Sequence, residues 1–329
     1  MDMTPAQQFE PWLADGEQQR RTRQGILGFA RQWASGPVRQ RLDRAMAALP
    51  GQSAEAVAEA ARALFADDAW VQDLLDGLAE RLRADPFFEP PFHYLNSDLH
   101  SGLIVFEDER VSIAAGVTHA AQLAARKSAP RGATSIGFPG RVIVLKFVRA
   151  GGARISLWRA PPITAGFTAA EAGRCARVGE RDLEDGDILT LDGRRKSYVI
   201  ERARANLVIL QAEITLDQAP LSVEYDSRTL AYAGCSATGD SASRIQMIAT
   251  LLRKLGRRDS FEPVAAFLDH PDFFVRWHVM KELLGIDRDA ALPHLKRMAA
   301  RDPHPETRRC ARTVLDRLEA GAPERRRAA

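Results

Sequence analysis

The sequence predicts an α+β protein of several domains: a helical N-terminal module, an antiparallel β-barrel or jelly roll, and a C-terminal array of α-helical repeats. Three observations predict this order. Apolar residues recur with helical spacing up to residue 85, short runs of alternating residues fill 86–235, and one pattern recurs every 32 residues within 240–320. At 329 residues, 45% of them hydrophobic, the chain is long enough for two or three domains with real cores.

Residues 1–85 have the features of packed helices. Ser53 stands where an N-cap would sit, ahead of an apolar run, and Asp85 precedes Pro86, which disfavours helical backbone in the residue before it. Apolar residues in the two stretches between these points are three or four apart, which lays one stripe along each helix. The positions are Val57, Ala61, Leu64 and Phe65, then Trp70, Leu74, Leu75, Leu78 and Leu82. Earlier apolar residues predict one or two further helices.

Residues 86–235 change to a period of two. Nine or ten short runs rich in Val, Ile, Leu and aromatics are separated by turn residues, which is typical of an antiparallel sandwich or barrel. The stretch 171–185 is expected to be a loop or a short helix. The alternation predicts that Lys146 and Gln211 point outward, so that the barrel interior is apolar or filled by side chains.

The run Glu-Asp-Gly-Asp-Ile-Leu-Thr-Leu-Asp-Gly at 184–193 resembles the second motif of the cupins, where a Gly-Asp pair opens a strand that ends in a turn. The resemblance implies a cupin-like jelly roll. In cupins a metal-binding His follows that turn, whereas Lys196 or Ser197 occupies the place here. The His-x-His of the first cupin motif occurs nowhere in the chain. We therefore expect a barrel without metal or other cofactor.

Three copies of Arg-x-x-φ-x-x-x-Leu, where φ is apolar, lie in register in the third part, starting at Arg244, Arg276 and Arg308. With its preceding Pro-containing turn at 271–275, the second copy resembles a HEAT-type repeat. The resemblance implies stacked helix pairs with an exposed ridge that suits another macromolecule. We expect the repeated arginines to bond to turn carboxylates, of which Asp240, Asp272 and Glu306 are within reach along the chain.

Basic residues that do not repeat are the predicted protein-binding surface of these helices. Residues 241–329 contain 18 basic and 12 acidic side chains, including the basic tail 321–329. The expected partner is a protein with an acidic surface, and nucleic acid is the lesser option because acidic residues are interspersed on the same helices. The predicted contact residues are Arg253, Lys254, Arg257, Arg258, His278, Lys281, Arg309 and Arg312.

One cluster offers an alternative. His93, Asp98 and His100 could form a facial triad of two His and one carboxylate, the ligand set of non-haem iron. The protein would then be a cupin-type, metal-dependent oxygenase acting on a protein or peptide recruited by the repeats. The competing interpretation is that these side chains bond to nearby backbone.

Composition excludes several other classes. No apolar run approaches the roughly 20 residues of a membrane span, and three distant cysteines indicate reduced thiols in a cytoplasm. Arginine outnumbers lysine by 40 to 6, a bacterial-like composition typical of a GC-rich genome. Neither a G-x-S-x-G elbow nor a P-loop is present. We therefore expect a cytoplasmic binding, scaffolding or regulatory protein rather than an enzyme.

Overall fold

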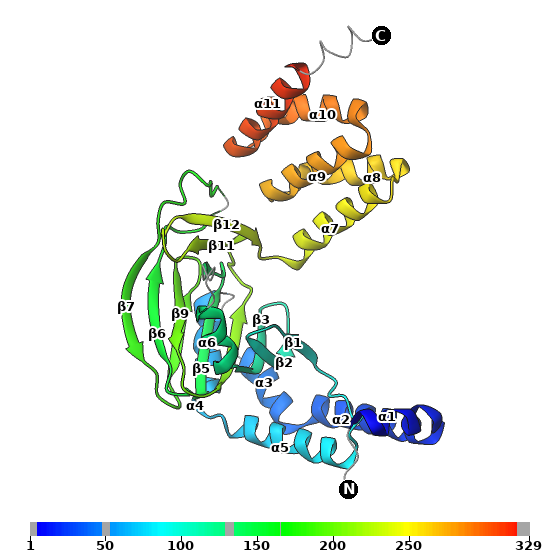
Figure 1. Ribbon diagram of the computed structural model, residues 1–329, viewed down its shortest axis with the longest axis vertical. Helices are drawn as coiled ribbons and strands as arrows, with labels where there is room; N and C mark the ends of the chain where they lie inside the picture. Colours follow the sequence, from blue (N-terminus) through cyan, green and yellow to red (C-terminus); the bar gives the residue numbers. More distant parts are fainter. Residues whose placement is uncertain (1–4, 48–52, 129–134, 165, 321–329) are drawn as a thin grey trace. The chain divides into compact units, whose positions relative to one another are not determined.

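The computed structural model describes residues 5–47, 53–128, 135–164 and 166–320 (Figure 1). The basic tail lies outside these residues. The chain divides into two compact units. The first contains residues 1–159, 175–218 and 226–230, and the second contains 160–174, 219–225 and 231–329. The second unit is therefore assembled from three separate stretches of chain.

Helices and antiparallel strands make up the first unit. Among the described residues, three helices precede residue 53, where one or two were predicted. Strand β7 lies within 171–185, where a loop or short helix was predicted. The helices are α1 (Pro5–Ala14), α2 (Gly16–Ser35), α3 (Pro37–Ala47), α4 (Ala54–Ala66), α5 (Ala69–Ala84) and α6 (Ala120–Ser128). The strands are β1 (His93–Asn96), β2 (His100–Glu107), β3 (Val111–Thr118), β4 (Ser135–Phe138), β5 (Val142–Arg149), β6 (Arg154–Arg159), β7 (Ala176–Asp182), β8 (Ile188–Asp192), β9 (Lys196–Arg202) and β10 (Leu207–Ile214).

Helices α4 and α5 form where the sequence predicted them. The Ser53 hydroxyl accepts a hydrogen bond from the backbone NH of Ala56 at 3.2 Å and caps α4. The predicted stripe of α4 is buried along its whole length. On α5, Leu74 and Leu78 are buried, whereas Leu75 and Leu82 are exposed. The buried stripe of α5 is thus narrower than predicted.

The strands form a jelly roll. One antiparallel sheet has the order β1-β2-β3-β10-β5-β8, and a second has the order β7-β6-β9 with β4 beside β9. From β3 to β10 the chain passes repeatedly from one sheet to the other, which is the double Greek key of jelly rolls. The predicted antiparallel architecture is confirmed.

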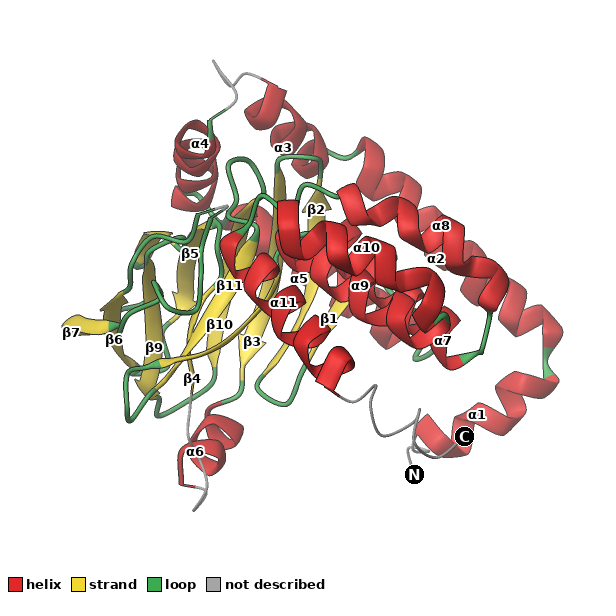
Figure 2. Ribbon diagram, turned by 90° about the horizontal axis from the view of Figure 1, so that it is seen from above, coloured by secondary structure: helices red, strands yellow, loops and turns green. Residues whose placement is uncertain are grey.

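The six-stranded sheet separates two apolar cores. One face packs against α2–α5, and α4 covers β5, β8 and β10 (Figure 2). The other face lines the interior of the jelly roll. Cross-strand partners share a face, so the pairing of Lys146 with Leu210 places Lys146 on the helical side. There it is buried, and its ammonium donates to the Phe65 carbonyl at 2.7 Å and lies 3.0 Å from Asp68.

The second unit consists of a β-hairpin and an array of helices. Its elements are β11 (Leu221–Asp226), β12 (Tyr232–Ala237), α7 (Asp240–Lys254), the 3₁₀ turn η1 (Arg258–Ser260), α8 (Phe261–Ala265), η2 (Ala266–Asp269), α9 (Phe273–Ile286), α10 (Arg288–Arg301) and α11 (Pro305–Ala320). Segments α8–η2 and α10 are the first helices of two pairs, and α9 and α11 are the second helices. Helix α7 packs against α9 and directly follows β12.

Residues 160–174 fasten the last helix within this unit. His304 Nε2 donates to the carbonyl of Phe167 at 3.2 Å, and Glu306 accepts a hydrogen bond from the NH of Ala169 at 3.2 Å. Further along the same stretch, the Ala172 carbonyl accepts a 2.7 Å hydrogen bond from the hydroxyl of Tyr225 on β11. The stretch therefore ties α11 to the hairpin.

Two of the three repeated arginines, Arg276 and Arg308, cap turns, but not through the predicted carboxylates. The side chain of Arg244 has no hydrogen bond or ion pair among the described residues. Arg276 donates from one guanidinium nitrogen to the carbonyls of His270 and Pro271, each at 2.8 Å. Arg308 makes the equivalent contacts one repeat later, with Asp302 and Pro303. The carboxylate that pairs with Arg276 belongs to Asp302 in the following turn, because the inter-repeat contact brings that turn next to α9. In the part of the chain that the structure covers, no helix is long and apolar enough to cross a bilayer.

Candidate binding sites

A cavity of about 380 Å³ opens on the interior face of the six-stranded sheet. Gly102 on β2 and Gly116 on β3 are cross-strand partners on this face. A Cβ atom at Gly102 would lie 2.6 Å from the Ala115 carbonyl oxygen, so the position excludes any side chain. This close approach of the two backbones keeps the space open. The lining also includes Leu95, Asn96, Ser97, His100, Ser101, Ala114, Val117, Thr118, Tyr198, Ile209 and Gln211.

The polar groups of this jelly-roll cavity are uncharged at neutral pH. A hydrogen bond of 2.9 Å links His100 Nδ1 with Thr118 Oγ1. Burial, with lesser contributions from His119 and Arg126, lowers the pKa of His100 below 6.5. Burial, assisted by the charge of Glu213, raises the pKa of Tyr198 to about 12. A neutral imidazole, a phenol and an amide suit a small, uncharged ligand with hydroxyl or carbonyl groups.

The orientation of Gln211 differs from the prediction that its side chain points outward. The register pairs Gln211 with Leu145, whose side chain belongs to the interior core, so Gln211 faces the cavity rather than outward. Its amide donates to Glu213 at 2.7 Å. Lys146 does point away from the interior, as predicted. The lining thus combines apolar side chains with uncharged polar groups, and the described lining residues include no charged one.

The structure does not bring the alternative metal ligands together. His93 lies opposite Ile104, four residues along β2 from His100, which is about 13 Å at the rise of a strand. Asp98 lies in the turn between β1 and β2. In the residues that the structure describes, no three His, Cys, Asp or Glu side chains converge as metal ligands would. Ser197, at the place of the cupin His, is buried and donates to the Gly137 carbonyl.

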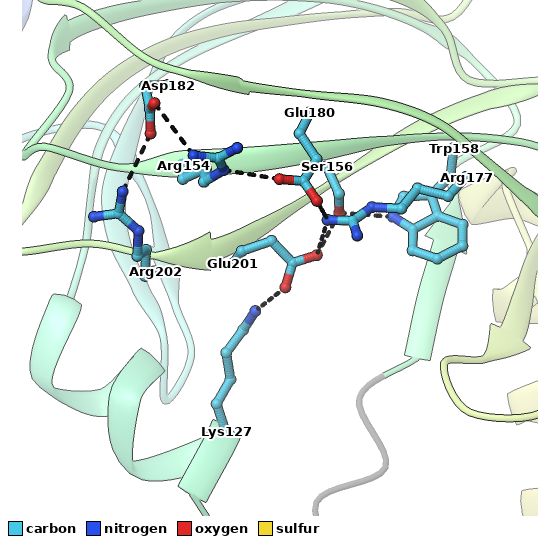
Figure 3. A network of polar contacts seen from close by, with 9 residues as sticks. All are labelled: Lys127, Arg154, Ser156, Trp158, Arg177, Glu180, Asp182, Glu201 and Arg202. Carbon is cyan, nitrogen blue, oxygen red and sulfur yellow. Dashed lines mark hydrogen bonds and ion pairs between the residues drawn. The ribbon is translucent and has the colours of Figure 1, made fainter.

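The outer face of the β7-β6-β9 sheet carries a ladder of charges that neutralise one another (Figure 3). Glu201 accepts hydrogen bonds from Ser156 at 2.5 Å and from Lys127 of α6 at 2.9 Å. Arg154 bridges Glu180 at 2.8 Å and Asp182 at 3.4 Å. These cross-strand pairs stabilise the sheet and leave no isolated charge among the nine residues drawn.

The structure separates the eight predicted interaction residues into two groups. Five are held by neighbours within the array. Arg253 bonds to Glu282, Arg257 to Asp259, His278 to Thr250, Arg309 to Glu306, and Arg312 to the Ala299 carbonyl. The other three, Lys254, Arg258 and Lys281, are exposed, and their side chains have no hydrogen bond or ion pair within the described ranges. Only these three are available to a partner without breaking an internal contact.

Sequence reasoning missed an exposed apolar face on α7. Met247, Ile248, Leu251 and Leu255, here named the α7 stripe, are 66%, 55%, 54% and 63% exposed. Their spacing of one, four and eight residues places them on one side of the helix. The spacing is visible in the sequence, but it is the same for a buried and for an exposed face. Exposed apolar residues gathered in this way mark interaction sites.

A second missed feature is a cavity of about 360 Å³ between the turns of the two repeats. The buried Arg276–Asp302 pair forms part of its lining. His294, Arg297 and Arg301 on α10 line it as well, at positions i, i+3 and i+7 of one helix face. That spacing was the signal that could have identified them.

Residues 234–316 match the family described as HEAT repeats, which confirms the helical-repeat prediction. Part of the chain is similar to a cupin domain from Bordetella pertussis Tohama I at 13% identity, over 37% of this chain and 98% of that one, with a TM-score of 0.22. It is also similar to a sugar phosphate isomerase from a cupin superfamily of Silicibacter pomeroyi, at 12% identity over 43% and 77% of the two chains, with a TM-score of 0.23. These TM-scores are low, and the jelly roll is established by its own strand order. No curated protein matches the sequence.

Proposed function

We propose that this is a non-catalytic binding or scaffolding protein whose helical repeats dock a partner protein with an acidic surface. The observation that carries the proposal is the α7 stripe together with the unpaired cations beside it. Four large apolar side chains within nine residues lie open to solvent, next to Lys254 and Arg258. Apolar area supplies affinity, and flanking charge supplies steering and selectivity.

The match to HEAT repeats supports the same conclusion, since such arrays present extended surfaces to other macromolecules. Lys281 on α9 and Arg301 on α10 extend the positive charge along the array. The favoured partner is therefore an acidic protein surface. Nucleic acid is less favoured because Asp269 and Asp302 lie within the same cavity as Arg297 and Arg301.

For the jelly roll we propose a regulatory role, as a site for a small uncharged ligand. The cavity volume and its neutral polar groups support this role. The alternative, an iron-dependent oxygenase, requires His93, Asp98 and His100 in one coordination sphere. The β1–β2 hairpin holds His93 and His100 at opposite ends, which favours the non-catalytic role.

The test compares the wild-type chain with K254E/R258E as bait for proteins in a bacterial extract, with captured proteins identified by mass spectrometry. We expect one or more acidic proteins to bind at about 0.05 M salt and to be lost at about 0.5 M salt. They should also be lost from K254E/R258E. The matched control is R62E/R83E, which reverses two exposed arginines of the first unit whose side chains have no hydrogen bond or ion pair in the described part of the chain. Capture that ignores both K254E/R258E and salt would contradict the proposal.

A further inference from the structure

The repeat register reveals what α7 lacks. Met247, Ile248 and Leu251 correspond, 32 residues later, to Val279, Met280 and Leu283 of α9. The three residues of α9 are completely buried, whereas those of α7 are more than half exposed. Equivalent positions of the same repeat are therefore core in one copy and surface in the other.

The difference follows from the helices that precede α7 and α9. The buried face of α9 belongs to one apolar cluster with residues of α8–η2 and α10, the first helices of their pairs. Helix α7 follows strand β12 instead, so its own pair has no first helix in the described chain. In Figure 1, α7 stands at one end of the helical array. The α7 stripe is thus half of a helix–helix contact.

We propose that the α7 stripe is the docking site for an amphipathic helix of a partner protein, which takes the position that α8–η2 and α10 hold in the complete pairs. This inference rests on the proposed function and specifies the partner by its chemistry. The two helices already in that position define the pattern of the occupant. Their buried residues include Phe261, Val264 and Leu268 in one, and Ala291, Leu295 and Met298 in the other. Both sets follow i, i+3 or i+4, i+7, the spacing with which a helix anchors in a groove.

The charge around the stripe selects the flanks of that helix. Arg244 lies three residues before Met247 and on the same side of α7, and Lys254 and Arg258 lie at the other end. The side chains of these three residues have no hydrogen bond or ion pair among the described residues. The acidic groups nearby are Asp240 at the start of α7 and Asp259, which is bound to Arg257. One acidic and one basic group, Asp240 and Arg244, lie at the start of α7, whereas the excess is positive at the other end. The partner helix therefore carries Asp or Glu on the side that meets Lys254 and Arg258.

The experiment pans a phage-displayed library of random 16-residue peptides against the full chain. We expect the enriched sequences to share apolar residues at i, i+3 or i+4, i+7, with Asp or Glu beyond one end of this row. A synthetic copy should become helical on binding, by circular dichroism. Its affinity should fall about tenfold or more for L251D. The matched control is L13D, because Leu13 is 53% exposed on a helix of the first unit and Leu251 is 54% exposed on α7. L13D should bind as wild type does.

Each contrary result overturns the inference. Enrichment of extended or Pro-rich peptides, equal binding to L251D, or no enrichment at all would show that a helix does not dock there. If the purified chain is a dimer that L251D dissociates, a second copy is the occupant instead. The proposed function is tested separately by the capture experiment. If proteins bind through Lys254 and Arg258 but no helical peptide binds the α7 stripe, the proposed function stands and only this inference fails. Unchanged melting temperatures of L251D and L13D establish that both variants are folded.

Discussion

Arg276 holds both carboxylate oxygens of Asp302 at 2.8 Å, and both side chains are almost fully buried. The pair joins α9 of one repeat to the turn that precedes α11 of the next. Asp302 also accepts a hydrogen bond from the backbone NH of His304 at 2.8 Å. One carboxylate therefore fixes the position of α11 relative to α9.

Asp302→Ala should lower the free energy of unfolding by about 3 kcal/mol, because it leaves the Arg276 guanidinium buried without its counter-charge. Arg308→Ala should cost only about 1 kcal/mol, since Arg308 caps turn carbonyls at a more exposed position. Denaturant unfolding followed by circular dichroism measures both. Equal losses of stability would show that the buried Arg276–Asp302 pair contributes no more than the turn contacts of Arg308.

Arg253→Glu and Lys254→Glu should differ although the residues are neighbours. Arg253 bonds to the nearly buried Glu282, so its reversal places two carboxylates together and should cost about 2 kcal/mol or more. Lys254 is exposed without a partner, and its reversal should change stability by less than about 0.5 kcal/mol. Differential scanning calorimetry of the two variants decides the point, and comparable losses would contradict the distinction between anchored and available cations.

Lys146→Ala should destabilise the first unit by about 2–3 kcal/mol, because the Phe65 carbonyl and Asp68 lose a buried donor. Lys196→Ala serves as the control, since Lys196 is exposed and has no partner among the described residues. The control should remain within about 0.5 kcal/mol of wild type in urea unfolding. A stable Lys146→Ala variant would mean that the ammonium is dispensable between helix and sheet.

The lowered pKa of His100 predicts a pH dependence of stability. Partial burial lowers the pKa of this imidazole in the folded state, while the unfolded chain protonates it near pH 6.5. Its contribution is therefore present above about pH 6.5 and is lost as the pH falls toward the folded-state pKa. His100→Gln should flatten this part of the curve of melting temperature against pH. In two-dimensional NMR the His100 ring should titrate below pH 6.5, and a higher midpoint would refute the neutral cavity.

Sequence periodicity predicted elements better than it predicted what covers them. The spacing of Leu74 and Leu78 identified the core face of α5, yet Leu75 and Leu82 at its margin remain exposed because the neighbouring helices cover only a narrow stripe. The alternating pattern correctly predicted that Lys146 points away from the jelly-roll interior. It could not predict that α4 buries the ammonium, because α4 lies 80 residues earlier in the chain.

The candidate sites show the same limit. Met247 and Leu251 follow the pattern of Val279 and Leu283, and nothing in those residues distinguishes an exposed copy from a buried one. The two copies differ because α7 lacks the neighbouring helix that covers α9. This difference depends on the arrangement of the helices and not on the residues of α7 itself. Likewise, the carboxylate for Arg276 lies 26 residues away rather than in its own turn, because the contact between repeats decides which turn is near.

The second unit is assembled from three separate stretches of chain, so its helices depend on residues far from them in the sequence. Cutting the chain before α7 would release the helices without Phe167 and Ala169, whose backbone groups bond to His304 and Glu306. The hairpin residue Tyr225, which holds the same stretch at Ala172, would be lost with them. A single continuous fragment that begins at α7 therefore lacks contacts that hold the helical array. A fragment that preserves these contacts must include the stretch between β6 and β7 as well as the hairpin and the helices.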